Sequence, residues 1–315
     1  MAKKNKNGLR LDANFTEDTV GFALESFLSL LSFPRLKYSI EPFSRGKERW
    51  LGADARINGH MAGFKPFYMQ FKRPSAYPDF STAKVITDRK ALKLPISRRP
   101  LYFDLRQKRP THQDYQHNIL YRLRQRLVKR NAGDAAYVCP LFLERSAYRF
   151  HVHLAGLSRW PRVWRLHPWD LEDILIHDLS GTVNYNAIPV LQEHVSIPPH
   201  DTVASAKHSY SFTERGTDLC FHSPLALPEG NRSLADFLTD VVGNGRANEG
   251  FIPPESAQGM LRSLFSGVTD EDRSGLLPDN FPMSDEHGIE SWLYWGDYLR
   301  NEYQIEQYAF VVWND

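Results

Sequence analysis

Residues 52–74 read GADARINGHMAGFKPFYMQFKRP, and this stretch decides which fold the rest of the chain is expected to adopt. Two runs that suit β-strands, 48–57 and 65–73, flank a turn bracketed by Gly59 and Gly63. We expect the two strands to pair with Asp54 opposite Gln70. Side chains two residues apart share one face of a strand, so Gln70 and Lys72 would both lie on the face that carries Asp54.

This trio of side chains suits metal-assisted hydrolysis of a phosphodiester. Asp54 would supply a hard oxygen ligand for Mg²⁺ (or Mn²⁺), and the Gln70 carbonyl would supply a second, uncharged one. Lys72 would orient or help to deprotonate the attacking water and offset the negative charge of the transition state. The structural alternative is an exposed cross-strand ion pair between Asp54 and Lys72, with Lys72 and Arg73 discouraging pairing at the sheet edge.

The segments around this hairpin predict a mixed α/β core. Residues 16–32 have the apolar stripe of a helix, with Thr16 as a plausible N-cap. A basic, proline-punctuated connection with a short helix near 81–92 is expected over 78–110. A second helix is expected over 112–130 and a buried strand over 135–142. One helix therefore precedes the sheet and another crosses over between two of its strands.

GADARI followed by QFK resembles the PD-(D/E)XK, or restriction-endonuclease-like, nuclease superfamily, and more narrowly its Mrr-like branch with a Q-x-K motif. The resemblance covers residues 16–145. It implies that Asp54, Gln70 and Lys72 are catalytic and that the Phe71 backbone carbonyl binds the metal together with Asp54 and Gln70. It also implies a catalytic, metal-binding glutamate on the preceding helix, for which Glu25 is the first choice and Glu17 the second. Glutamine in place of an acid removes one negative charge from the metal site.

Charge is distributed unevenly along the chain, although the net charge is only +2. The middle of the sequence is basic, whereas from Asp270 onward Arg273 and Arg300 are the only basic residues. A basic segment predicts contact with a polyanion, and a solvated surface is the alternative. The residues predicted to contact the nucleic-acid backbone are Arg73, Arg98, Arg99, Arg106, Lys108, Arg109, Arg122, Arg126 and Lys129.

The second half of the chain carries weaker patterns. Residues 148–155 alternate like a strand, 207–223 read as a hairpin around Arg215-Gly216, and helices are expected near 233–242, 255–266 and 288–302 before a last strand, QYAFVVW. We expect a nuclease-like domain over 1–228 and an acidic, mainly helical region over 229–315. The predicted fold class is thus α/β, a restriction-endonuclease-like mixed sheet flanked by helices with a mainly helical C-terminal extension.

The expected function is that of a Mg²⁺-dependent endonuclease acting on nucleic acid, with DNA favoured and RNA left open, in defence against foreign DNA or phage. Two cysteines and no apolar run near ~18 residues predict a cytoplasmic protein that does not enter a membrane. One alternative is a catalytically inactive nucleic-acid-binding subunit. Another is an interaction module of a defence complex with a helicase or ATPase, and a protein partner or a homo-oligomer would fit either.

Overall fold

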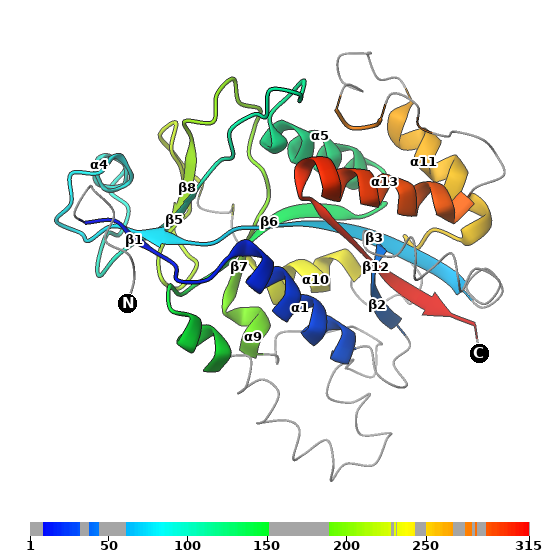
Figure 1. Cartoon of the computed structure of the whole chain (residues 1–315), viewed down its shortest axis with the longest axis horizontal. Helices are drawn as coiled ribbons and strands as arrows, with labels where there is room; N and C mark the ends of the chain where they lie inside the picture. Colours follow the sequence, from blue (N-terminus) through cyan, green and yellow to red (C-terminus); the bar gives the residue numbers. More distant parts are fainter. Residues whose placement is uncertain are drawn as a thin grey trace, which may run out of the picture.

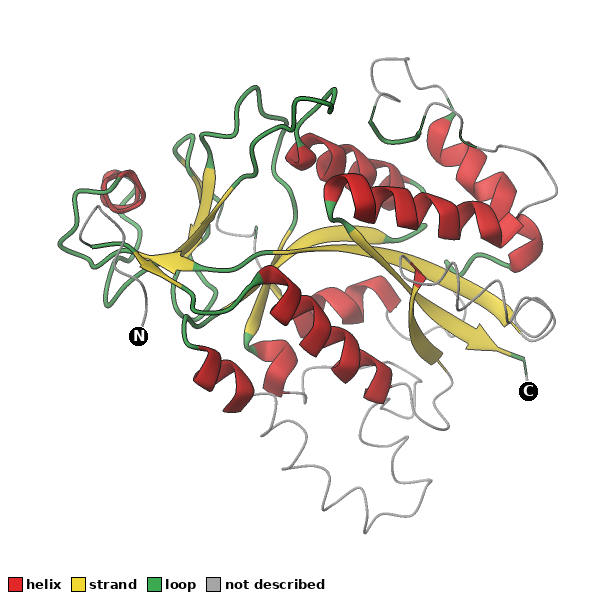
Figure 2. Ribbon diagram, in the orientation of Figure 1, coloured by secondary structure: helices red, strands yellow, loops and turns green. Residues whose placement is uncertain are grey.

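Two six-stranded sheets organise the computed structural model, which describes residues 9–31, 38–43, 61–150, 189–227, 230, 232–242, 250–266, 275–278, 281 and 288–314. The central sheet has the order β11 (Arg232–Ser233), β7 (His194–Ile197), β6 (Asp134–Pro140), β3 (Met61–Phe71), β12 (Glu306–Trp313) and β2 (Tyr38–Pro42). The side sheet has the order β1 (Leu11–Asp12), β4 (Ser75–Ala76), β5 (Leu101–Asp104), β8 (Ser209–Phe212), β9 (Cys220–Phe221) and β10 (Leu225–Ala226). Figure 2 shows the side sheet at one end of the central sheet. Because both sheets are combined with helices, the fold is mixed α/β.

Helices cover both faces of the central sheet (Figure 1). Phe67 on β3 packs against Phe237 of α10 on one face, at 6.1 Å between ring centroids, whereas Tyr68 packs against Trp295 of α13 on the other, at 5.6 Å. Adjacent strand residues point to opposite faces, so β3 is apolar on both sides. The helices are α1 (Glu17–Leu31), α4 (Lys84–Ala91), α5 (Gln116–Lys129), α9 (Pro189–Gln192), α10 (Leu234–Val242), η2 (Pro254–Ser256), α11 (Ala257–Phe265) and α13 (Gly288–Tyr303).

The crossover from β3 to β6 confirms the predicted arrangement of this part of the chain. β6 runs parallel to residues 67–71 of β3, and α5 belongs to the connection between them. Gly133 lies in the turn after α5 with a φ of +145°, and a Cβ there would overlap the carbonyl oxygen of Pro66. A glycine is required at this point because the turn passes directly over the β3 backbone.

The predicted hairpin between 48–57 and 65–73 is wrong in its register. Gly63 and Ala62, placed in the turn by that prediction, lie inside β3, which starts at Met61. Residues 67–69 of β3 are hydrogen-bonded to β6 on one edge and to β12 on the other. The edges that a strand at 48–57 would need are therefore taken, because a strand has only two hydrogen-bonding edges. Residues 44–60, which contain the whole predicted strand 48–57 and Asp54, lie outside the described residues.

The expected domain division at residue 228 does not coincide with a break in the core. β12 lies in the central sheet between β3 and β2 and is antiparallel to both, and Trp313 Nε1 donates to Ser39 Oγ across 274 residues of sequence. Buried side chains from α1, β3, α5, α10, α11 and α13 belong to one hydrophobic cluster. The C-terminal segment is thus part of the central sheet and its helical layers.

Most other predicted elements are confirmed within a few residues. Thr16 caps α1, since its Oγ1 accepts a hydrogen bond from the Thr19 amide at 3.3 Å. The predicted hairpin over 207–223 is present as β8 and β9, with Gly216 at a φ of +73° in the turn. The strand expected over 148–155 is wrong where it can be checked, because residues 145–150 are helical and 151–155 lie outside the described residues.

Candidate active site

The polar side chains predicted from the Q-x-K motif lie at the carboxyl end of β3. Gln70 is 2% exposed and Lys72 is 4% exposed. The Lys72 amide donates to the Val138 carbonyl at 2.9 Å, which continues the pairing with β6 one residue past the end of the strand. Lys72 is therefore fixed by the sheet itself.

Lys72 is a buried amine with few compensating charges. Its Nζ lies 5.6 Å from the centroid of the Tyr137 ring on β6. Burial lowers the pKa of Lys72 because the charged form loses hydration, while the carboxylate of Glu17 raises it and the guanidinium of Arg106 lowers it further. An amine with a lowered pKa can exchange a proton near neutral pH more readily than an exposed lysine.

Gln70 has an unused acceptor. Its Oε1 is buried and has no hydrogen-bond partner among the described residues. Gln70 shares a face of β3 with Tyr68, which packs against Trp295, so the amide lies on the α13 side of the central sheet. A buried amide oxygen of this kind is normally satisfied by water, an ion or another donor.

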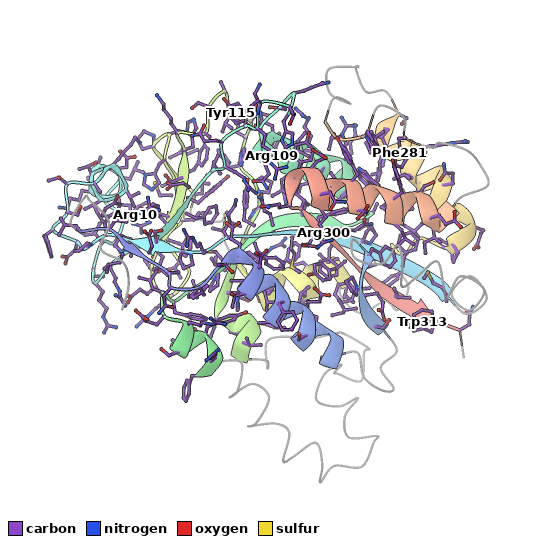
Figure 3. All side chains as sticks on the ribbon, viewed as in Figure 1. Arg10, Arg109, Tyr115, Phe281, Arg300 and Trp313 are labelled. Atoms are coloured by element: carbon purple, nitrogen blue, oxygen red, sulfur yellow. The ribbon has the colours of Figure 1, made fainter. Side chains whose placement is uncertain are left out.

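A cleft of about 240 Å³ opens beside the end of β3, and we call it the β3 cleft. Arg300, labelled in Figure 3, contributes to its wall from α13, and its Nε lies 3.2 Å from Glu306 Oε1 at the start of β12. Arg106 approaches from the loop after β5 and donates to Gln304 Oε1. The residues that line the cleft are Glu17, Asp18, Gly21, Phe71, Arg300, Asn301, Gln304 and Glu306.

The helix glutamate next to Lys72 is Glu17 rather than Glu25. Glu17 lines the β3 cleft and is the carboxylate with the largest effect on the pKa of Lys72. Glu25 lies two turns further along α1, about 12 Å along the helix axis, and does not line the cleft. The second choice made from the sequence therefore fits the geometry better than the first.

The described residues supply only part of the ligand set that a metal ion would need. They contain no group of three or more His, Cys, Asp or Glu side chains placed to hold a metal ion. The buried Oε1 of Gln70, which lacks a partner there, fits a missing cation or water, and Glu17 adds one carboxylate beside Phe71. Asp54, the ligand expected from the sequence, falls outside those residues.

The predicted nucleic-acid-binding residues separate into exposed and internally bonded groups. Arg122 lies 2.6 Å from Asp114 Oδ2, and Arg126 donates to the Leu264 carbonyl at 2.9 Å, so both stabilise the packing around α5. Arg109 is half-buried and is labelled with Tyr115 in Figure 3 on the loop that leads into α5. The exposed residues are Arg73, Arg98, Arg99, Arg106, Lys108 and Lys129. Of these, Arg99 pairs with Glu214 at 3.0 Å.

Another polar cluster resembles a proton relay but cannot receive a substrate. Asp88 Oδ2 lies 2.8 Å from His222 Nδ1, and His222 Nε2 lies 2.8 Å from Ser211 Oγ. Ser211 is fully buried, and its oxygen also accepts a hydrogen bond from Arg89 at 3.0 Å. The cluster therefore fastens α4 to β8 and β9, because no nucleophile in it is accessible.

Sequence reasoning missed the part of the β3 cleft that comes from the end of the chain. Arg300, Asn301, Gln304 and Glu306 follow one another around the junction of α13 and β12. The only local indication in the sequence is Glu306, an acidic residue at the start of a strongly apolar strand. Nothing local indicates that this strand pairs with β3.

Comparisons with protein-family models, with curated proteins and with solved structures found no match to this chain. No helix in the described ranges is long and apolar enough to cross a membrane. What the protein does must therefore be argued from the residues at the end of β3 and their geometry.

Proposed function

We propose that the protein is a Mg²⁺-dependent nuclease with a restriction-endonuclease-like core that hydrolyses phosphodiester bonds of nucleic acid, with DNA favoured. One observation carries the proposal: Lys72 is a buried amine that directly follows Phe71, and Phe71 lines the β3 cleft together with Glu17. Gln70, two residues earlier, keeps a buried oxygen with no partner among the described residues. A structural lysine would normally be found on the surface or in a buried ion pair.

The order of elements supports the same core. α1 precedes β3, and α5 crosses over to β6, which lies parallel to β3. This is the succession of helix, strand, crossover helix and core strand that the resemblance implies over residues 16–145. The exposed arginines and lysines on the loops before α5 would contact the phosphate backbone.

The chemistry assigned to the chain is the handling of charge and protons at the scissile phosphate. Lys72, with its lowered pKa, would take a proton from the attacking water or, when protonated, stabilise the phosphorane-like transition state. Arg106 and Arg300 would neutralise phosphate oxygens at the mouth of the cleft. Glu17, Gln70, the Phe71 carbonyl and Asp54 would hold Mg²⁺, which supplies Lewis-acid stabilisation of the developing charge when bound.

The test is cleavage by the purified chain of plasmid, linear and single-stranded DNA and of RNA, with Mg²⁺ or with EDTA. We expect cleavage that requires the metal and that Lys72→Met reduces by at least roughly 100-fold. The matched control is Lys207→Met, which replaces an exposed lysine away from the cleft. Thermal melting of both variants shows whether they fold. Undiminished cleavage by a folded Lys72→Met protein would remove the assignment.

A second candidate function is nucleic-acid binding without hydrolysis. It is favoured by the position of Lys72, whose Nζ lies 5.6 Å from the centroid of the Tyr137 ring. This function predicts binding that weakens steeply with salt and no cutting with Mg²⁺ or Mn²⁺. A cytoplasmic role in defence against foreign DNA, alone or with a helicase or ATPase, is compatible with either candidate and belongs to the proposal.

A further inference from the structure

A second and larger cleft, which we call the α5 cleft, lies between α5 and the loop after β7. Its volume is about 520 Å³, within the range of small-molecule sites and about twice that of the β3 cleft. The two clefts share no lining residue. The α5 cleft is lined by Tyr121, Arg124, Gln125, Pro198, Pro199, His200, Asp201, Leu227 and Gly230.

The loop wall of the α5 cleft is held in place by its neighbours. The His200 amide donates to Tyr210 Oη at 2.7 Å, and its ring packs edge-on against Phe221 at 5.7 Å. One residue further, the Asp201 carbonyl accepts a hydrogen bond from His117 Nε2 of α5 at 2.8 Å. A wall fixed in this way loses little conformational freedom when a ligand binds.

The apolar part of the lining suits a flat ring. Tyr121 contributes an aromatic side chain from α5, and Pro198, Pro199 and Leu227 contribute aliphatic surface. Tyrosine and proline surfaces of this kind accept the face of a nucleobase, which can stack without regard to its sequence context. A small inorganic ion would leave this surface unused.

The polar part of the lining suits the edge of a base better than an isolated phosphate. Arg124 lies 2.9 Å from Asp134 Oδ1, and the other oxygen of Asp134 accepts from Arg232 at 2.5 Å. Arg232 also pairs with Asp240, so two guanidinium groups face two carboxylates and the Arg124 guanidinium is oriented with little net charge around it. Gln125 and Asp201 are exposed and add donor and acceptor groups at the same opening. An arginine whose charge is offset by carboxylates can donate two hydrogen bonds to a neutral ligand without requiring a negative charge on it.

We propose that the α5 cleft binds a guanine base. The guanidinium of Arg124 would donate to the O6 and N7 acceptors, as arginine does when it reads guanine in DNA. Asp201 Oδ1 already accepts from the Thr202 amide at 2.7 Å, so its Oδ2 would accept from the N–H groups on the other edge of the base, and the ring would lie against Tyr121. Adenine carries an amino group where guanine carries O6, so an adenine in the same position would place its N–H donor against the N–H donors of Arg124, which disfavours binding.

The base would come either from a free guanine nucleotide or from an unpaired position of a strand. This inference goes beyond the proposed hydrolysis, because it concerns a different cleft and needs no metal. It would make the chain a reader of guanine whether or not it cuts nucleic acid.

The experiment is isothermal titration in EDTA, where no metal-dependent cleavage takes place. The probes are GMP, AMP, a short thymine oligonucleotide with one central guanine, and the same oligonucleotide without guanine. We expect GMP or the guanine oligonucleotide to bind at least about tenfold more tightly than its partner probe, which is the size of one good base contact. Binding of GMP indicates a free nucleotide as the source, and binding of the oligonucleotide alone indicates a strand.

Variants of the lining residues place the binding in the α5 cleft. Tyr121→Ala should weaken it about fivefold, since it removes stacking, and Asp201→Asn, at an exposed position with a φ of +41° that asparagine tolerates, should weaken it about fivefold because it removes the carboxylate acceptor. The matched control is Tyr77→Ala, which removes a half-buried tyrosine that stacks on Tyr102 instead. Lys72→Met should leave guanine binding unchanged, which separates this inference from the proposed hydrolysis. Equal binding of guanine and non-guanine probes, no binding of either, or full affinity in both cleft variants would overturn it.

Discussion

Replacing His117 with glutamine is expected to make the protein less sensitive to acid. His117 is 2% exposed on α5, and both ring nitrogens are used: Nε2 donates to the Asp201 carbonyl and Nδ1 accepts from the Tyr137 hydroxyl, each at 2.8 Å. Burial lowers the pKa of His117 from 6.5 to about 4, opposed by the Asp201 carbonyl and assisted by the charge of Lys72. The folded state therefore keeps the imidazole neutral where the unfolded chain would protonate it.

The sign and size of the effect follow from that difference in pKa. Between the two values the unfolded chain binds more protons than the folded protein, so stability falls as the pH falls through 6.5 towards 4. A difference of about 2.5 pKa units corresponds to a loss of about 2 kcal/mol by about pH 5 and about 3 kcal/mol by about pH 4. His117→Gln removes this contribution, because the amide does not titrate and can still donate and accept one hydrogen bond each.

The assay is urea unfolding followed by tryptophan fluorescence at several pH values between about 4 and 8. The free energy of unfolding of His117→Gln should fall less steeply with decreasing pH than that of the parent. Between the two pKa values, the difference between the two slopes should correspond to the uptake of close to one proton on unfolding. His208→Gln is the control, because it removes a half-buried imidazole near β8. Identical slopes for His117→Gln and the parent would show that His117 is protonated in the folded state and would refute the argument.

Two further predictions concern single positions. Gly133→Ala should destabilise the protein by more than about 2 kcal/mol in the same unfolding assay, because φ is +145° and the new Cβ overlaps the Pro66 carbonyl; wild-type stability would contradict the observed turn. Gln307→Leu should stabilise the protein by about 1 kcal/mol, because both amide atoms of this buried side chain on β12 have no partner among the described residues. Gln258→Leu is the comparison, because Gln258 is a second buried glutamine whose amide atoms have no partner among the described residues. A loss of stability in Gln307→Leu would indicate that water bridges the Gln307 amide instead.

Elements with a strong local pattern were predictable from the sequence. α5 repeats apolar residues at every fourth position, and Ile119, Leu123 and Leu127 of that repeat are buried. β6 and β12 are continuous apolar runs, which suit strands that are covered on both faces. In each case one periodicity or one run was long enough to outweigh the alternatives.

Pairing between distant segments was not predictable. The hairpin prediction assumed that β3 pairs with its neighbour in sequence, which is the commoner outcome, whereas β12 arrives from the far end of the chain. The same limitation affects the site. Burial of Gln70 and Lys72 follows from their place on and directly after a central strand. The internal acceptor for Arg126, the Leu264 carbonyl, depends on a tertiary contact, as does the contribution of Glu306 to the cleft.

The position of β12 sets the order in which the protein can mature during synthesis. At about 5–20 residues per second, the ribosome needs roughly 14–55 seconds to add the 274 residues between Ser39 and Trp313. Throughout that interval β2 and one edge of β3 lack their partner strand β12, and unpaired strand edges can pair wrongly with other nascent chains. The same delay would leave the wall of the β3 cleft incomplete, because Glu306 reaches it only when β12 pairs between β2 and β3.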